Sequence, residues 1–159
     1  MPFAEEDQKH LTAAEGYLEL RMPLDANDEI ESMDPDVRHL PEVLEVRVGI
    51  YRTLEKWELM QTVAKRLALH DPDQVQWTVW WAFATRRADS LEAARLILVN
   101  ALERLPEVAI FHYNLACYEA QLGDIESAKT HLRRAIELRK EYQRRALEDE
   151  DLRPVLDSL

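Results

Sequence analysis

The stretch NLACYEAQLGDIESAKTHLRRAIEL, residues 114–138, decides the fold of this chain of 159 residues. Apolar and small residues recur in it at spacings of three and four, which places them on one face of each of two helices. Gly123 suits the left-handed end of the first helix, and Asp124 can cap the second. One unit earlier, Asp89 and Glu92 have capping-box spacing, so we expect Asp89 to cap a helix there. The stretch predicts two antiparallel helices joined by a tight turn.

The same pattern occurs three times, at intervals of 34 residues. Units that begin at Pro41, Val75 and Ala109 have small or apolar residues at their positions 8, 20, 24 and 27. For the three units in order, these positions hold Val48, Ala82 and Ala116, then Met60, Ala94 and Ala128, then Ala64, Leu98 and Leu132, then Leu67, Ala101 and Ala135. Such a register indicates a repeat protein in which neighbouring units bury each other's apolar faces.

The unit length and the small residues at positions 8, 20 and 27 resemble the tetratricopeptide repeat (TPR) family. The resemblance implies an all-α fold, a right-handed superhelix of antiparallel helix pairs that forms a TPR-like α-solenoid. It also implies a non-enzymatic adaptor or scaffold for protein binding. We expect a single domain over 1–159, with a degenerate N-terminal capping repeat at 5–40, repeats at 41–74, 75–108 and 109–142, and a C-terminal capping helix at 143–159.

An aromatic stretch, QWTVWWAFATRR, occupies residues 76–87. Trp81 falls on a core position of its repeat and Trp77 on a position that packs against the preceding helix, so we expect both to be structural. Trp80 and Phe83 fall on the opposite side of the same helix, and two interpretations stay open for them. Either the N-terminal segment or a second copy covers them, or they line a groove that binds an apolar helix or an extended peptide of a partner.

In the TPR family the first helix of each repeat lines a concave groove. The matching positions imply a partner-binding groove made of Arg52, Val79, Trp80, Phe83, Arg86, Arg87, Tyr113, Asn114, Cys117 and Gln121. The asparagine would bond the partner's backbone, and the three arginines would attract carboxylates.

One specialisation of the family does not carry over. Repeats that hold the C-terminal carboxylate of heat-shock proteins have lysine, asparagine and arginine at five groove positions. Here these positions hold Glu45, Gly49, Trp80, Ile110 and Asn114. We therefore do not expect that chaperone function.

The net charge of −11 is unevenly distributed. Residues 1–40 contain eleven acidic and three basic side chains. A basic patch follows much later, made of Lys129, Arg133, Arg134, Arg139, Lys140, Arg144 and Arg145. These residues are either solvated helix faces or a surface for an acidic protein, an anionic membrane or the acidic end of a second copy, which would give self-association. We expect no nucleic acid as a partner, because the total charge is negative.

The sequence offers no catalytic, metal or cofactor motif. Three scattered glycines cannot build a phosphate-binding loop, and the five histidines lack metal-ligand spacing. Cys117 is the only cysteine, which excludes an internal disulfide, and we expect it to be a packed side chain. The longest apolar run, 79–84, is far shorter than the roughly 18 residues of a membrane span. We expect a soluble, cytoplasmic protein without enzymatic activity, cofactor or metal.

In overall form, the chain is similar to small stand-alone bacterial TPR proteins. These include a kinesin-light-chain-like protein that accompanies bacterial tubulin, which implies a filament-associated adaptor that could link a cytoskeletal filament to a membrane. Another hypothesis is a chaperone or regulatory subunit that shields an apolar segment of a client. The main prediction remains an adaptor with an aromatic-lined groove.

Overall fold

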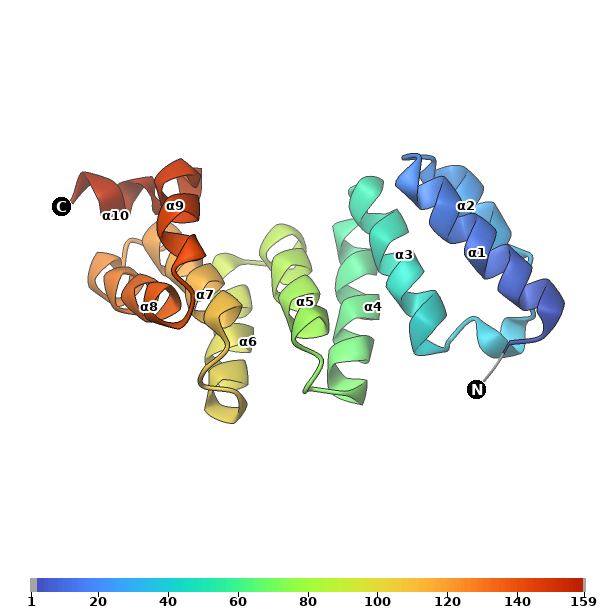
Figure 1. The fold of residues 1–159 in the computed structure, drawn as a ribbon, viewed down its shortest axis with the longest axis horizontal. Helices are drawn as coiled ribbons and strands as arrows, with labels where there is room; N and C mark the ends of the chain where they lie inside the picture. Colours follow the sequence, from blue (N-terminus) through green and yellow to red (C-terminus); the bar gives the residue numbers. More distant parts are fainter. Residues whose placement is uncertain (1–2, 159) are drawn as a thin grey trace.

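The computed structural model describes residues 3–158, so residues 1–2 and 159 of the expected domain lie outside the described residues. All regular secondary structure within residues 3–158 is helical, and consecutive helices pack against each other along an elongated stack (Figure 1). Three helix pairs form its centre: α3 (Pro41–Thr53) with α4 (Trp57–His70), α5 (Val75–Ala88) with α6 (Leu91–Arg104), and α7 (Ala109–Gln121) with α8 (Ile125–Leu138). The first helix of each pair begins where a 34-residue unit begins.

The N-terminal part of the stack is a helix pair of its own. Helices α1 (Glu5–Glu19) and α2 (Pro23–Glu31) precede a 3-10 turn, η1 (Pro35–Val37), and share an apolar cluster with α3. Gly49 allows α1 to approach α3 closely, because a Cβ at this position would lie 2.5 Å from Cδ2 of Leu18. Arg47 of α3 donates hydrogen bonds to Glu31 (2.7 Å) and Asn27 (3.2 Å) of α2.

The C-terminal part differs from the expected closing helix at 143–159. The chain forms α9 (Glu141–Glu148), a 3-10 turn η2 (Glu150–Leu152) and a short α10 (Arg153–Asp157). Asp149 interrupts the helix with an extended backbone, and its carboxylate accepts a hydrogen bond from the backbone N–H of Asp151 at 3.0 Å. Pro154 then occupies the first turn of α10, where its missing N–H is tolerated.

The turns within the repeats follow local chemistry with one correction. Gly123 has a φ of 88°, and Asp124 caps α8 by accepting from the backbone N–H of Ser127 at 3.2 Å. The prediction that Asp89 caps the next helix of its unit is wrong. Ser90 is the N-cap of α6, because the helix begins at Leu91 and the Ser90 hydroxyl accepts from Ala93 N–H at 3.1 Å.

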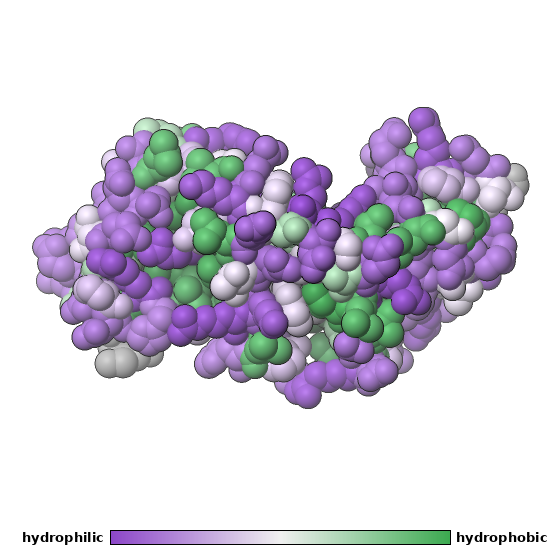
Figure 2. All heavy atoms as spheres, turned by 180° about the vertical axis from the view of Figure 1, so that it is seen from behind, coloured by the Kyte–Doolittle hydropathy of each residue, from purple (hydrophilic) through white to green (hydrophobic). Residues whose placement is uncertain are grey.

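Part of the apolar surface is not buried. Seen from behind, apolar side chains gather toward the C-terminal half of the molecule (Figure 2). Leu69 and Leu96 are 63% and 56% exposed, and they border an open depression of about 850 Å³ on α4 and α6. Trp81, which we expected to be a core residue, is only partly buried and lines the same depression. No helix within residues 3–158 is long and apolar enough to cross a membrane.

Candidate functional site

A cavity of about 300 Å³ lies on the side of the stack formed by α3, α5 and α7. The spacing of three and four residues along α5 places its groove residues on one helix face. We define the groove by the residues that line this cavity: Arg52, Gln76, Val79, Trp80, Phe83, Arg86, Ile110, Asn114, Cys117, Tyr118, Arg145, Asp149 and Asp151. The structure therefore brings together seven of the ten residues expected from the sequence, namely Arg52, Val79, Trp80, Phe83, Arg86, Asn114 and Cys117.

The other three expected residues lie beside the groove. The Arg87 guanidinium stacks over the Trp57 ring at 4.7 Å and lines a separate depression. Tyr113 is fully buried. Gln121 is exposed, and its side-chain amide donates a hydrogen bond to the backbone carbonyl of Asp151 at 2.9 Å. None of the three lines the cavity itself, but Tyr113 and Gln121 bond the C-terminal residues that form one end of it.

The aromatic wall of the groove is formed by Trp80 and Phe83, which are both partly buried. The Phe83 and Trp57 rings meet edge to face, with their centroids 5.6 Å apart. The Arg52 guanidinium lies 4.8 Å from the centroid of the Phe83 ring. Trp77 is structural, because it is buried and its indole N–H donates to Glu45 at 3.1 Å. None of residues 3–40 lines the groove, so the N-terminal segment does not cover the aromatic wall in this structure.

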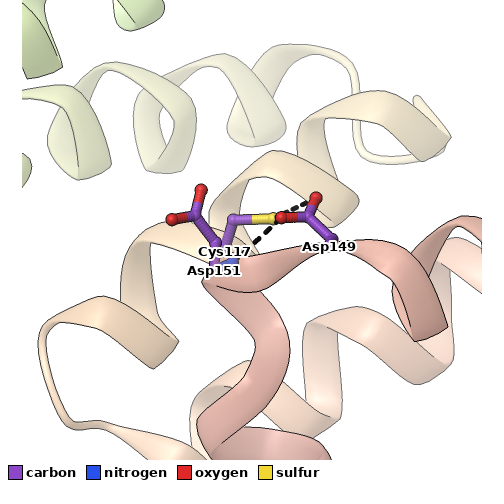
Figure 3. Close-up of side chains that lie close together, drawn as sticks. All are labelled: Cys117, Asp149 and Asp151. Carbon is purple, nitrogen blue, oxygen red and sulfur yellow. Dashed lines mark hydrogen bonds between the residues drawn. The ribbon is translucent and has the colours of Figure 1, made fainter.

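The C-terminal segment closes one end of the groove, a feature that the sequence analysis missed. Both terminal nitrogens of Arg86 donate to the carboxylate of Asp151, at 2.6 and 2.9 Å. The Tyr113 hydroxyl donates to Oδ2 of Asp149 at 2.7 Å. The side chains of Asp149 and Asp151 flank Cys117 (Figure 3). The one available signal was the acidic run 148–151, which begins three residues after the last arginine of the basic patch.

The titratable groups at this end form a hydrogen-bonded network. Burial raises the pKa of Cys117, and the carboxylates of Asp149 and Asp151 raise it further. Its thiol therefore stays protonated and lies 3.7 Å from Oδ2 of Asp149, as a weak hydrogen-bond donor. Burial also raises the pKa of Tyr113, and the hydrogen bond to Asp149 acts in the same direction. Both groups thus serve as donors to one carboxylate.

These three side chains also have the proximity of metal ligands, because Cys117, Asp149 and Asp151 each offer an atom within 4.8 Å of the others. Metal binding by cysteine requires the thiolate, which the raised pKa disfavours. The carboxylate oxygens are also engaged by Arg86 and Tyr113. The chemistry of the cluster fits a network of donors and acceptors better than a metal site.

The expected basic patch is dispersed over α8 and α9. Three of its members lie within 4 Å of carboxylates: Lys129 pairs with Glu126, Arg134 with Glu107 and Glu137, and Arg139 with Glu141. Arg133, Lys140 and Arg144 are exposed. Arg145 belongs to the groove instead, where its guanidinium lies 4.8 Å above the Tyr113 ring. The seven residues do not act as one unpaired surface.

A second polar cluster lies between α7 and α8. Nε2 of His112 lies 2.8 Å from the carbonyl oxygen of Pro106, so it carries a proton and donates. Nδ1 of a neutral His112 is then an acceptor, and it lies 3.1 Å from Nδ1 of His131. Nε2 of His131 faces Oε1 of Glu119 at 3.3 Å. We define these side chains, His112, Glu119 and His131, as the buried triad.

Burial favours the neutral forms of two members of the buried triad, Glu119 and His131. Glu119 is 1% exposed, and neither of its carboxylate oxygens has a hydrogen-bond partner within residues 3–158. Burial raises the pKa of Glu119 and lowers the pKa of His131. A proton held on Glu119 would complete a neutral chain of donors from this carboxyl through both imidazoles to Pro106.

No family model matches the sequence, and no curated protein matches it. Two solved structures of MamA, a TPR-containing protein, share the fold. MamA 41-end from Desulfovibrio magneticus RS-1 is 13% identical with a TM-score of 0.75, and the match covers 98% of this chain and 92% of that chain. The MamA RS-1 ArsTM double mutant is 13% identical with a TM-score of 0.74 and the same coverage. The predicted fold class, a TPR-like α-solenoid, is confirmed.

Proposed function

We propose that this protein is a non-enzymatic adaptor that binds an extended segment of another protein in the groove. The observation that carries the proposal is the aromatic wall of Trp80 and Phe83 beside polar side chains from three helices, Arg52, Gln76 and Asn114. Apolar walls with a few convergent polar groups are typical of binding sites. The aromatic rings would take an apolar side chain, and the Asn114 amide would bond a backbone group of the partner.

The polar side chains of the groove favour an extended segment over a helix. The backbone groups of a helix are bonded within the helix itself. Those of an extended chain are free to bond the Asn114 and Gln76 amides that line the cavity of about 300 Å³. An extended chain presents alternate side chains to a groove and needs less width, so it is the ligand geometry that we propose.

The chemistry of the groove favours binding over catalysis. Its one cysteine is held as a thiol by burial, and a thiol is a poor nucleophile compared with a thiolate. The Tyr118 hydroxyl also has its pKa raised by burial. The groove thus offers donors, acceptors and apolar walls but no activated base or nucleophile, which supports the non-enzymatic proposal.

A capture experiment tests the adaptor function. Immobilised wild-type protein and the Trp80→Ala, Phe83→Ala double variant would be exposed to a lysate of the cells that express the protein. The matched control is the Leu69→Ala, Leu96→Ala double variant, which removes apolar side chains from the outer depression. We expect one protein to be retained by wild type and the control and lost by the groove variant. Retention of the same proteins by all three forms contradicts the proposal.

Stability must be followed in the same experiment. Trp80 and Phe83 pack against the apolar cluster of α3, α4 and α5, so their removal also weakens the fold. Melting curves of both double variants show whether each is folded at the temperature of capture. A single Trp80→Phe variant keeps an aromatic ring, and we expect it to retain most of the binding.

A further inference from the structure

Residues 149–152, Asp149-Glu150-Asp151-Leu152, occupy one end of the groove, and we call them the DEDL segment. The carboxylate of Asp151 receives two hydrogen bonds from Arg86, and that of Asp149 receives one from the Tyr113 hydroxyl. Gln121 donates to the backbone carbonyl of Asp151 at 2.9 Å. The next side chain, Leu152, is fully buried in the apolar cluster around α7.

These contacts have the pattern of a bound peptide. Two acidic side chains separated by one residue meet dedicated donors, a side-chain amide bonds the backbone, and an apolar residue anchors the end. Each receiving group belongs to α5 or α7, the helices that form the groove. The paired donation from Arg86 is the geometry by which guanidinium groups recognise carboxylates.

The charge of the groove also matches an acidic ligand. Three arginines line it, Arg52, Arg86 and Arg145, and its only lining carboxylates among the described residues belong to the DEDL segment. Arg52 and Arg145 stack on the aromatic rings of Phe83 and Tyr113 and have no carboxylate within 4 Å among residues 3–158. Without the segment, the cavity would be lined by three cations and no anion.

We propose that this end of the groove is a receptor for an Asp-x-Asp-Leu segment of a partner protein, and that the chain's own DEDL segment occupies the receptor until the partner displaces it. The inference rests on the proposed function, since it names the partner's chemistry and the competition at the same groove. Because the segment follows the last full repeat, it can leave without separating the helix pairs of the stack. The incoming leucine replaces Leu152, whose exposure would otherwise oppose the exchange.

A peptide-binding experiment on the full chain tests the exchange. The probe is a fluorescein-labelled peptide of residues 147–157, LEDEDLRPVLD, and the receptor is the Asp149→Asn, Asp151→Asn double variant. The matched control is the Glu148→Gln, Glu150→Gln variant, which removes the same charge from two exposed neighbours. We expect the receptor variant to bind at least about tenfold more tightly than wild type or the control, because its own segment has lost both carboxylates.

Salt and peptide sequence define the expected mode of binding. Affinity should fall between about 0.1 M and about 1 M salt, where the Debye length shrinks from about 10 Å to about 3 Å. A peptide with asparagine at both aspartate positions should not bind. A folded receptor variant that binds the probe no better than wild type overturns the inference. If the probe does not bind but capture from the lysate still depends on Trp80 and Phe83, the receptor inference is wrong. The proposed function is then unaffected.

Two further measurements keep the result decisive. If the double variant does not fold, amide hydrogen exchange of the wild type is measured with and without excess probe. Faster exchange at residues 149–152 in the presence of the probe supports displacement of the segment, and unchanged exchange contradicts it. Sedimentation of wild type mixed with the receptor variant tests a second copy as occupant. If the two proteins form a heterodimer that the probe dissociates, the occupant is a second copy of this chain, and the proposal of a separate partner protein is wrong. If both proteins remain monomers, the result supports a separate partner protein.

Discussion

Helix α7 carries a polar cluster on each of two sides. Toward the groove, Tyr113 and Gln121 bond the C-terminal segment, and Arg86 of α5 pairs with Asp151. Toward α8, the buried triad holds a carboxylate that is 1% exposed and lacks a hydrogen-bond partner among the described residues. The groove cluster consists of matched charges near solvent, which can exchange one carboxylate for another. The buried triad can only gain or lose a proton, so its contribution is to stability and its pH dependence.

The largest expected effect separates packing from hydrogen bonding on the groove side. Tyr113 is fully buried and stacks on Tyr142 with ring centroids 4.7 Å apart. Tyr113→Ala should lower the free energy of unfolding by about 3–5 kcal/mol, as for other large aromatic deletions. Tyr113→Phe keeps the ring and loses the bond to Asp149, so it should cost only about 1–2 kcal/mol. Urea denaturation measures both, and equal losses would show that the hydroxyl, rather than the ring, dominates.

Glu119→Gln tests the buried side through its pH dependence. Because burial raises the pKa of Glu119, the folded state binds this proton more tightly than the unfolded chain does. The stabilisation is complete below the unfolded pKa near 4.5 and is lost as the pH rises through the higher folded pKa. Glutamine stays neutral at every pH. The free energy of unfolding of the variant, minus that of wild type, should therefore be about 1–3 kcal/mol larger at alkaline pH than at acidic pH.

Urea denaturation of wild type and Glu119→Gln at several pH values between about 4 and about 8 provides the measurement. The lowered pKa of His131 acts in the opposite direction, since its stabilisation is lost as the pH falls below about 6.5. Because His131 contacts Glu119, its titration is followed by NMR in both proteins and subtracted before the remaining difference is assigned to Glu119. Parallel pH profiles would contradict the assignment of a buried, protonated Glu119.

A double-mutant cycle sharpens the contrast with the groove. Arg86→Ala, Asp151→Ala and the double variant should give a coupling free energy of about 1 kcal/mol, because the pair is partly buried and doubly hydrogen-bonded. The coupling should weaken in about 1 M salt, whereas the Glu119 effect should not change. A coupling of zero would mean that Asp151 is held by its backbone contacts and that Arg86 is free for other ligands.

The smallest effect is expected for Arg87→Ala. Arg87 is the neighbour of Arg86, but it stacks on Trp57 outside the groove. Its removal should cost about 0.5 kcal/mol, the lower end of the range for an exposed cation–π contact. Binding of the LEDEDLRPVLD peptide to the receptor variant should be unaffected by the change. A loss of binding equal to that of Arg86→Ala would extend the receptor beyond the groove as defined.

The repeat period predicted the helices because each unit repeats the same local packing. It also placed Trp80, Phe83 and Asn114 together, since helix spacing puts them on one face of successive first helices. It could not place Asp151 against Arg86, a contact between residues 65 positions apart in a segment outside the repeat register. His112 and Glu119 lie seven residues apart and share a helix face by period. Their link through His131 depends on how α8 packs against α7. The residue pattern of a single helix carries no information about that packing.

Photo-crosslinking in the expressing cells tests the central claim most directly. A benzoylphenylalanine would replace Gln76, which is exposed and lines the groove, or Asn100, which is exposed and lines the outer depression. We predict a protein adduct from position 76 that is lost when Trp80→Ala and Phe83→Ala are added, and none of the same mass from position 100. An adduct formed only from position 100 would contradict the account and move the binding surface to α4 and α6.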